Sequence, residues 1–162
     1  MSVAYLSALS ALAGSIVGGL TSGMKAGLAY PTWPDMHGQL IPSTLFTEKA
    51  SSAGFMTYNA QDLWTRTLVQ LAHRLTAYTL ILLVVIFFFK SRNITQDRIF
   101  KTGLNLFPVV VLGQACIGII TIINCVGKVP VTWGVLHQAG AMLLVAETVF
   151  IIFHLNYTTH EQ

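Results

Sequence analysis

Four apolar stretches, each long enough to cross a lipid bilayer, constrain this chain more than any other feature of its sequence. A membrane-spanning helix needs about 20 predominantly apolar residues, since each residue adds about 1.5 Å of rise. Charged residues make up only 9% of the chain, whereas a soluble domain usually carries about 25%. The sequence therefore predicts an all-α, integral membrane four-helix bundle that forms one domain over residues 1–162. The predicted spans cover residues 5–29, 66–89, 101–124 and 131–154.

The basic residues predict how these spans are oriented. Four of them crowd the connection between the second and third spans: Lys90, Arg92, Arg98 and Lys101. Because inward-facing connections carry an excess of Lys and Arg, we expect this connection and both chain termini to lie inside. The long loop 31–65 and the turn 125–130 should then face outward, with a short surface helix near Ala60–Thr65. The three tryptophans fall at outer ends of spans, where an aromatic belt is expected: Trp33, Trp64 and Trp133.

Two histidines are the strongest candidates for a functional site. His73 lies seven residues into the second predicted span, and His137 lies six residues into the fourth. Both spans run inward, so both side chains should lie about 10 Å below the outer boundary. An imidazole in hydrocarbon needs a partner, and a pair at one depth can hold one metal ion or one haem iron. The alternative is two unrelated polar residues that bond to helix backbones.

Small residues follow both histidines on the same helix face. Ala77 and Ala141 each come four residues after a histidine, which places them one turn deeper. Such side chains would let a flat macrocycle lie against both helices, and we therefore include them among the cofactor-binding candidates. Ordinary packing of small residues between membrane helices is the alternative.

Cations near the outer boundary could neutralise the propionates of a haem bound there. The candidates are Lys25, Arg66, Arg74 and Lys128. Arg66 precedes His73 by seven residues and shares its helix face, whereas Arg74 points about 100° away. Snorkelling to the membrane interface would also explain Lys25, Arg66 and Lys128. Arg74 lies deeper and needs a carboxylate, a carbonyl or water.

Other polar residues predict structure more than chemistry. Glu147 lies deep in the fourth span, where a carboxyl group is costly unless protonated, hydrated or paired. His154, seven residues further along the same face, could pair with it, and we favour a structural or water-exposed role for Glu147 over a proton relay. His37 in the outer loop and His160 in the polar tail should be solvated.

The cysteines and glycines also predict packing. Cys116 and Cys125 are nine residues apart, about 13 Å along one helix, which is too far for a disulfide, so both are expected to be small core residues. Gly19, Gly23 and Gly27 share one face of the first span. That face permits close approach of another helix, from this chain or from a second subunit.

Several short motifs resemble the C-terminal half of the haem A synthase family. They are the segments 26–30 (AGLAY), 32–36 (TWPDM), 41–42 (IP), 69–74 (VQLAHR), 129–130 (VP) and 136–138 (LHQ). Family members typically have eight spans in two similar four-helix halves. The resemblance implies that His73 and His137 are the axial ligands of one haem b, and that this chain carries no catalytic residue.

The chain lacks the catalytic glutamate of the family's other half and departs from the pattern of its own half at two positions. The family's other half carries a catalytic glutamate four residues before a histidine, and the position four before His73 is Val69. The family often has Asp at the position of Ala72 and Asn at the position of Pro31. These two changes remove no proposed ligand, although they could alter the loop or the electrostatics near the haem.

The resemblance implies half of a haem A synthase, split or half-size, that supports oxidation of haem O to haem A by electron transfer. A second membrane chain, or self-association, would then supply the missing half. The alternatives are a non-catalytic bis-histidine cytochrome b-like or structural subunit of a respiratory complex, and a scaffold without haem. We expect a lipid bilayer, either mitochondrial inner or bacterial cytoplasmic, and no nucleic acid, since the chain has no dense basic face.

Overall fold

The computed structural model describes residues 2–47, 63–93 and 97–160. Its helices are α1 (Ser2–Gly23), the 3-10 helix η1 (Ala26–Leu28), α2 (Thr44–Thr47), α3 (Leu63–Ser91), α4 (Arg98–Ile123) and α5 (Val131–His160). The four long helices are each long and apolar enough to cross a membrane. Within the described ranges, helices are the regular structure, apart from one isolated bridge in the outer loop. The predicted all-α membrane fold is confirmed.

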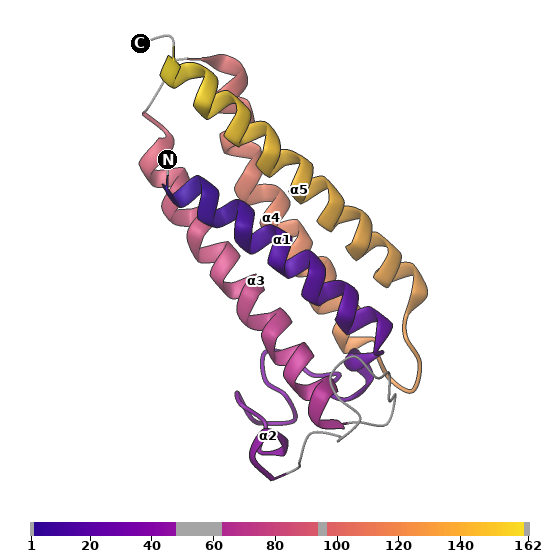
Figure 1. The fold of residues 1–162 in the computed structure, drawn as a ribbon. Coiled ribbons are helices and arrows are strands. Elements are labelled where there is room, and N and C mark those ends of the chain that lie inside the picture. The colour runs from indigo at the N-terminus through magenta and orange to yellow at the C-terminus, as the bar shows by residue number, and fades with distance from the viewer. Residues whose placement is uncertain (1, 48–62, 94–96, 161–162) are drawn as a thin grey trace.

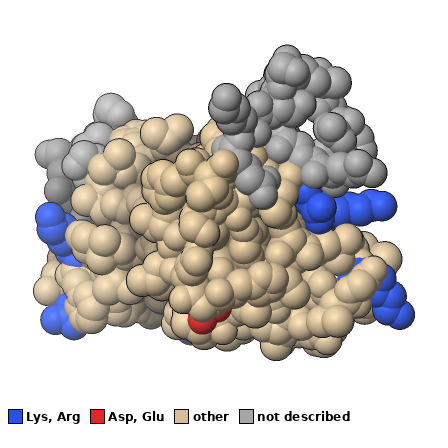
Figure 2. Space-filling model, turned by 90° about the horizontal axis from the view of Figure 1, so that it is seen from below, with Lys and Arg blue, Asp and Glu red and all other residues tan. Residues whose placement is uncertain are grey.

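The four long helices form an antiparallel bundle. Helices α1 and α4 each pack against both α3 and α5, so α3 and α5 lie diagonally opposite each other. In Figure 1, α1 lies in front and α4 behind, while both chain ends and the α3–α4 connection share one end of the bundle. Lys and Arg gather toward the two ends of the molecule in Figure 2, and the wide surface between them is nearly uncharged. The inward orientation of the end with the termini stays a prediction.

Most helix boundaries differ from the predicted spans by one to six residues, and two of the differences concern the outer loop. Helix α1 ends at Gly23 rather than at residue 29, because Lys25 adopts φ 50° and the tight turn of η1 follows it. Helix α3 begins at Leu63, three residues before the predicted start. Of the surface helix expected near Ala60–Thr65, Thr65 belongs to α3 and residues 60–62 lie outside the described residues. The short helix of the described loop is α2 instead.

The apolar core fills the half of the bundle that lies nearest the chain termini. It is built from large side chains that are almost completely buried, including Val84, Phe100, Leu104, Phe107 and Ile151. Phe87 and Phe107 meet edge to face, with ring centroids 6.4 Å apart. The equivalent central positions nearer the loops hold glycines and the two histidines instead. That half of the bundle therefore has no comparable apolar core among its described residues.

One face of α3 holds the outer loop in place. Its polar side chains recur every three or four residues, as one helix face requires. Trp64 Nε1 donates to the Leu45 carbonyl at 3.2 Å, and Gln70 Nε2 donates to the Tyr30 carbonyl at 2.8 Å. Thr67 Oγ1 donates to the Tyr30 hydroxyl at 3.3 Å. The loop is therefore tied to α3 along about two turns of helix.

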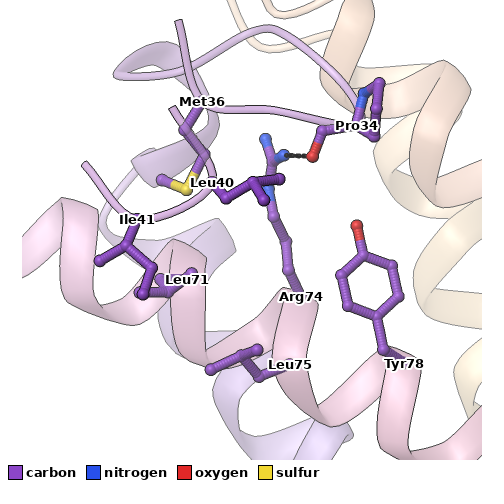
Figure 3. Close-up of a pocket in the computed structure, with 8 residues that line it drawn as sticks. All are labelled: Pro34, Met36, Leu40, Ile41, Leu71, Arg74, Leu75 and Tyr78. Atoms are coloured by element: carbon purple, nitrogen blue, oxygen red, sulfur yellow. Dashed lines mark hydrogen bonds between the residues drawn. The ribbon is translucent and has the colours of Figure 1, made fainter. Parts of the chain in front are cut away.

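Among the α3 side chains that bind the loop, Arg74 makes the most hydrogen bonds. Its guanidinium donates to four backbone carbonyls, at 2.7 Å to Thr32, 2.8 Å to Asp35, 3.2 Å to Pro34 and 3.4 Å to Tyr30. Figure 3 shows the side chain reaching from α3 into the loop. The sequence predicted a carboxylate, a carbonyl or water as the partner of Arg74, and the loop provides backbone carbonyls.

Replacing Arg74 by Lys should loosen the loop while keeping the charge. A lysine ammonium cannot reproduce the planar fork that contacts several carbonyls at once, and losing hydrogen bonds to a charged donor costs about 1.5–3 kcal/mol each. We expect the Met36 amide, which donates to the Gln39 carbonyl at 2.8 Å, to exchange its hydrogen about tenfold faster or more. Arg92→Lys, at the other end of the bundle, is the control. Unchanged exchange at Met36 in Arg74→Lys would contradict this account.

Candidate functional site

The rings of His73 and His137 meet in the middle of the bundle. Their centroids lie 6.1 Å apart and their planes are at 87°. The two side chains come from α3 and α5, so they approach each other across the bundle from diagonally opposite helices. Metal–imidazole bonds are about 2.0–2.1 Å long, which puts two nitrogens on opposite sides of one metal about 4 Å apart. Since each centroid lies behind its nitrogen, the observed separation fits such a pair.

The Nδ1 atoms of both rings, in His73 and in His137, are buried and have no hydrogen-bond partner among the described residues. Backbone carbonyls nevertheless approach each ring, from Gly14 in α1 to His73 and from Gln114 in α4 to His137. A ligating histidine usually donates its second ring N–H to a carbonyl or carboxylate. The Gly14 and Gln114 carbonyls are therefore the nearest candidates to accept such a hydrogen bond.

Two glycines allow the neighbouring helices to lie against these rings. A Cβ at Gly18 would sit 3.1 Å from His73 Cε1, and a Cβ at Gly118 would sit 2.8 Å from His137 Cε1. The lack of a side chain at these positions lets α1 and α4 lie close to the histidines, and the restriction is tighter at Gly118 than at Gly18. The sequence analysis did not select either glycine, since helical glycines in membrane spans usually indicate helix packing.

The glycine face predicted in the first span contacts the rest of the described chain only at Gly27. Around Gly19 and Gly23, added Cβ atoms would meet no described atom within 4 Å, whereas Gly27 lies against Cys125. Cys125 is buried, and burial raises the pKa of its thiol. Cys116 is exposed, so its prediction as a core residue is wrong. Both cysteines are free, as their spacing predicted.

The donor set is better suited to a haem than to a bare metal ion. In the described ranges, no group of three or more His, Cys, Asp or Glu could hold a metal. Two imidazoles leave most of a metal's coordination unfilled, and a porphyrin supplies the other ligands from its own nitrogens. Ala77 and Ala141, half-buried one turn beyond each histidine, add small side chains to the same region. The residues present therefore fit a haem between α3 and α5.

The predicted cations are spread over the end of the bundle that carries the long loop. Lys25 and Lys128 are exposed, and Arg66 donates to the Lys25 carbonyl at 2.8 Å. The Arg74 guanidinium is directed into the loop rather than toward the histidine rings. Contact of these four residues with a bound haem stays a prediction.

A separate cavity of about 420 Å³ lies between the outer loop and α3 (Figure 3). Its walls are apolar except for Arg74 and Tyr78, and it opens on the face of α3 that carries Arg74, about 100° from His73. It is therefore distinct from the space between the two histidines. Its lining residues are Pro34, Met36, Leu40, Ile41, Leu71, Arg74, Leu75 and Tyr78.

The other predicted polar residues stay away from this site. Glu147 is buried, and neither carboxyl oxygen has a hydrogen-bond partner in the described part of the chain. The pairing with His154 that the sequence allowed is not formed, and His154 Nδ1 instead lies 3.0 Å from the Phe150 carbonyl. His37 is exposed, as expected, and the side chain of His160 lies outside the described residues.

Comparison with known proteins places this geometry in a family. Residues 1–149 match the profile of the COX15-CtaA family, described as cytochrome oxidase assembly protein. The chain is 36% identical over 134 residues to the heme A synthase of Nitrosospira multiformis, covering 83% of this chain and 35% of that protein. It is 35% identical over 139 residues to that of Sinorhizobium medicae, covering 85% and 34%. No solved structure matches the chain.

A third relative, the heme A synthase of Flavobacterium psychrophilum, is 34% identical over 138 residues, which cover 85% of this chain and 38% of the relative. The chain thus spans about a third of the length of the curated relatives it matches. With four helices able to span a membrane and bacterial relatives of this kind, it is an integral protein of the bacterial cytoplasmic membrane. The chain belongs to the COX15-CtaA family of cytochrome oxidase assembly proteins.

Proposed function

We propose that this protein is the b-type haem-binding half of a haem A synthase. In this proposal His73 and His137 are the axial ligands, and the chain supports oxidation of haem O to haem A by electron transfer. One observation carries it: two imidazoles from diagonally opposite helices meet with centroids 6.1 Å apart, in the half of the bundle without an apolar core. The relatives named heme A synthase support a role in haem A biosynthesis.

The protein's own residues would orient the two ligands. Each histidine would bind through its outer nitrogen and donate its Nδ1–H to a carbonyl, from Gly14 for His73 and from Gln114 for His137. A haem held in this way supplies electron transfer, because both axial positions are filled. Gly18 and Gly118 let α1 and α4 close on the rings and limit access of lipid and water.

The C–H oxidation itself needs groups that this chain does not supply at the expected position. Val69 stands where the family's catalytic half has a glutamate. We therefore propose a second membrane polypeptide, or a second copy of this chain with altered chemistry, as the partner. Lys25, Arg66 and Lys128 lie at the outer end, where they would neutralise the haem propionates, while most Arg74 donors are already committed to the loop.

A second candidate function is a non-catalytic cytochrome b-like or structural subunit of a respiratory complex, with which Val69 is equally consistent. Purification from the native membrane in mild detergent separates the two. The synthase requires a copurifying chain, or a second copy, whose membrane helices present an intramembrane glutamate and further histidines. A stable place in a respiratory complex without such a chain would establish the subunit instead.

Each of the two histidines should be indispensable for haem binding. Replacing His73 or His137 by Ala removes one axial ligand, so we expect the low-spin b-type signal to vanish from the reduced-minus-oxidised spectrum. His37→Ala and His154→Ala are the matched controls and should keep that signal. A normal low-spin spectrum in His137→Ala would rule out the proposed ligand pair.

A side chain at Gly118 should also weaken haem binding. In Gly118→Val the new Cβ, 2.8 Å from His137 Cε1, would displace the ring, and loss of ligand orientation typically costs about 10–100-fold in affinity. Haem titration of the purified protein measures this effect. Gly113→Val tests the same change on the same helix at a position with no described atom within 4 Å of the new Cβ. Equal affinities in the two variants would disprove the steric argument.

A further inference from the structure

We propose that Gln114 and Gly140 form one coupled unit that positions His137, and that Thr76 and Gly14 are its counterpart at His73. The effect on haem rests on the proposed function, whereas the coupling itself rests on packing alone. At His73 the side chain that bonds to the histidine backbone is on the histidine's own helix, whereas at His137 it is on the neighbouring helix. In each case a glycine on the other helix of the pair faces that side chain.

The two histidines occupy equivalent places in two helix pairs. His73 of α3 packs against Gly18 of α1, and His137 of α5 packs against Gly118 of α4. Figure 1 shows these two pairs as the halves of the bundle. Two further positions can be matched between the pairs. Four residues before the glycine stands Gly14 in the first pair and Gln114 in the second. Three residues after the histidine stands Thr76 in the first pair and Gly140 in the second.

At each site a polar side chain donates to the histidine backbone. Thr76 Oγ1 lies 2.8 Å from the His73 carbonyl and 3.1 Å from the Ala72 carbonyl, and its hydroxyl donates within its own helix. Gln114 Nε2 donates to the His137 carbonyl at 2.7 Å, from the neighbouring helix. His73 is therefore supported locally, while His137 is tied to α4 by a bond between helices.

A glycine faces the donor at each site, but only Gly140 is needed to make room for it. A Cβ at Gly140 would overlap Gln114 Oε1, so a side chain at residue 140 requires the amide at residue 114 to move away from its present place. At Gly14 the added Cβ would lie 3.9 Å from Thr76 Oγ1, which is ordinary contact. Gln114 and Gly140 are thus the more tightly coupled of the two combinations.

The amide of Gln114 also bears an unsatisfied group. Its Oε1 is buried and has no hydrogen-bond partner among the described residues. A buried acceptor without a donor is unfavourable, so this side chain is a poor choice for stability alone. Its single bond to the His137 backbone indicates a positioning residue.

The test rebuilds the arrangement of His73 at His137. Gln114→Gly removes the tie, and Gly140→Thr forces a hydroxyl against the amide. The double variant places both residue types as they occur at positions 14 and 76. In haem-loaded protein we expect each single change to speed haem loss about tenfold and to shift the low-spin electron paramagnetic resonance signal. The double variant should return both to within about twofold of the parent, since contacting positions are non-additive.

Two controls separate positioning from general stability. Thr148 Oγ1 donates to the Leu144 carbonyl at 2.7 Å inside the apolar half, so Thr148→Gly should lower the denaturation temperature without moving the resonance signal. Gly113→Thr adds the same side chain where no described atom lies within 4 Å, and should leave the rate of haem loss unchanged.

Thermal denaturation of the parent, the two single variants and the double variant, all without haem, measures the coupling between residues 114 and 140 independently of haem binding. If the parent binds no haem but the double variant melts higher than Gly140→Thr, the coupling stands and the proposed function falls. If haem binds and the double variant loses it as fast as the two single effects combined predict, the inference is overturned while the haem site remains.

Discussion

The burial of two imidazoles inside a lipid-embedded bundle is the constraint on which the rest of the structure depends. A ring nitrogen without a partner in such a place is costly, so the helices around it must bring a partner close. Gly18 and Gly118 remove the side chains that would keep α1 and α4 away, and the carbonyls of Gly14 and Gln114 can then approach the rings. The large apolar side chains are displaced to the other half of the bundle, where Phe100 and Phe107 are buried.

The spans and the histidine pair could be predicted because they depend on rules that act along one helix. Apolar length marks a span, and two polar residues at one depth in spans of one direction should lie level. Neither rule says which helices are diagonal, so the sequence could not show that the rings meet across the bundle. Gly18 was missed because its role appears only when α1 is packed against α3. The end of α1 was misplaced because the left-handed turn at Lys25 follows an apolar stretch without a proline.

Arg74 illustrates a limit of reading charges from sequence. Its depth required a partner, and a propionate, a carbonyl and water were equally consistent with its position in the chain. The choice came from the loop, which turns the carbonyls of Tyr30, Thr32, Pro34 and Asp35 toward one point. Such convergence depends on backbone conformation over several residues, which no spacing rule describes. Glu147 and His154 share a helix face but do not bond, since seven residues separate them by about 10 Å along the helix.

The confinement of the aromatic and aliphatic cluster to the end with the chain termini bears on biogenesis. All four long helices contribute to that cluster, so it can assemble from the polypeptide alone and hold the helices in register. The opposite end would be the last part to consolidate. Under the proposed function, a haem would then enter an already assembled bundle. Supply of the haem and insertion of the polypeptide would therefore not need to be synchronised.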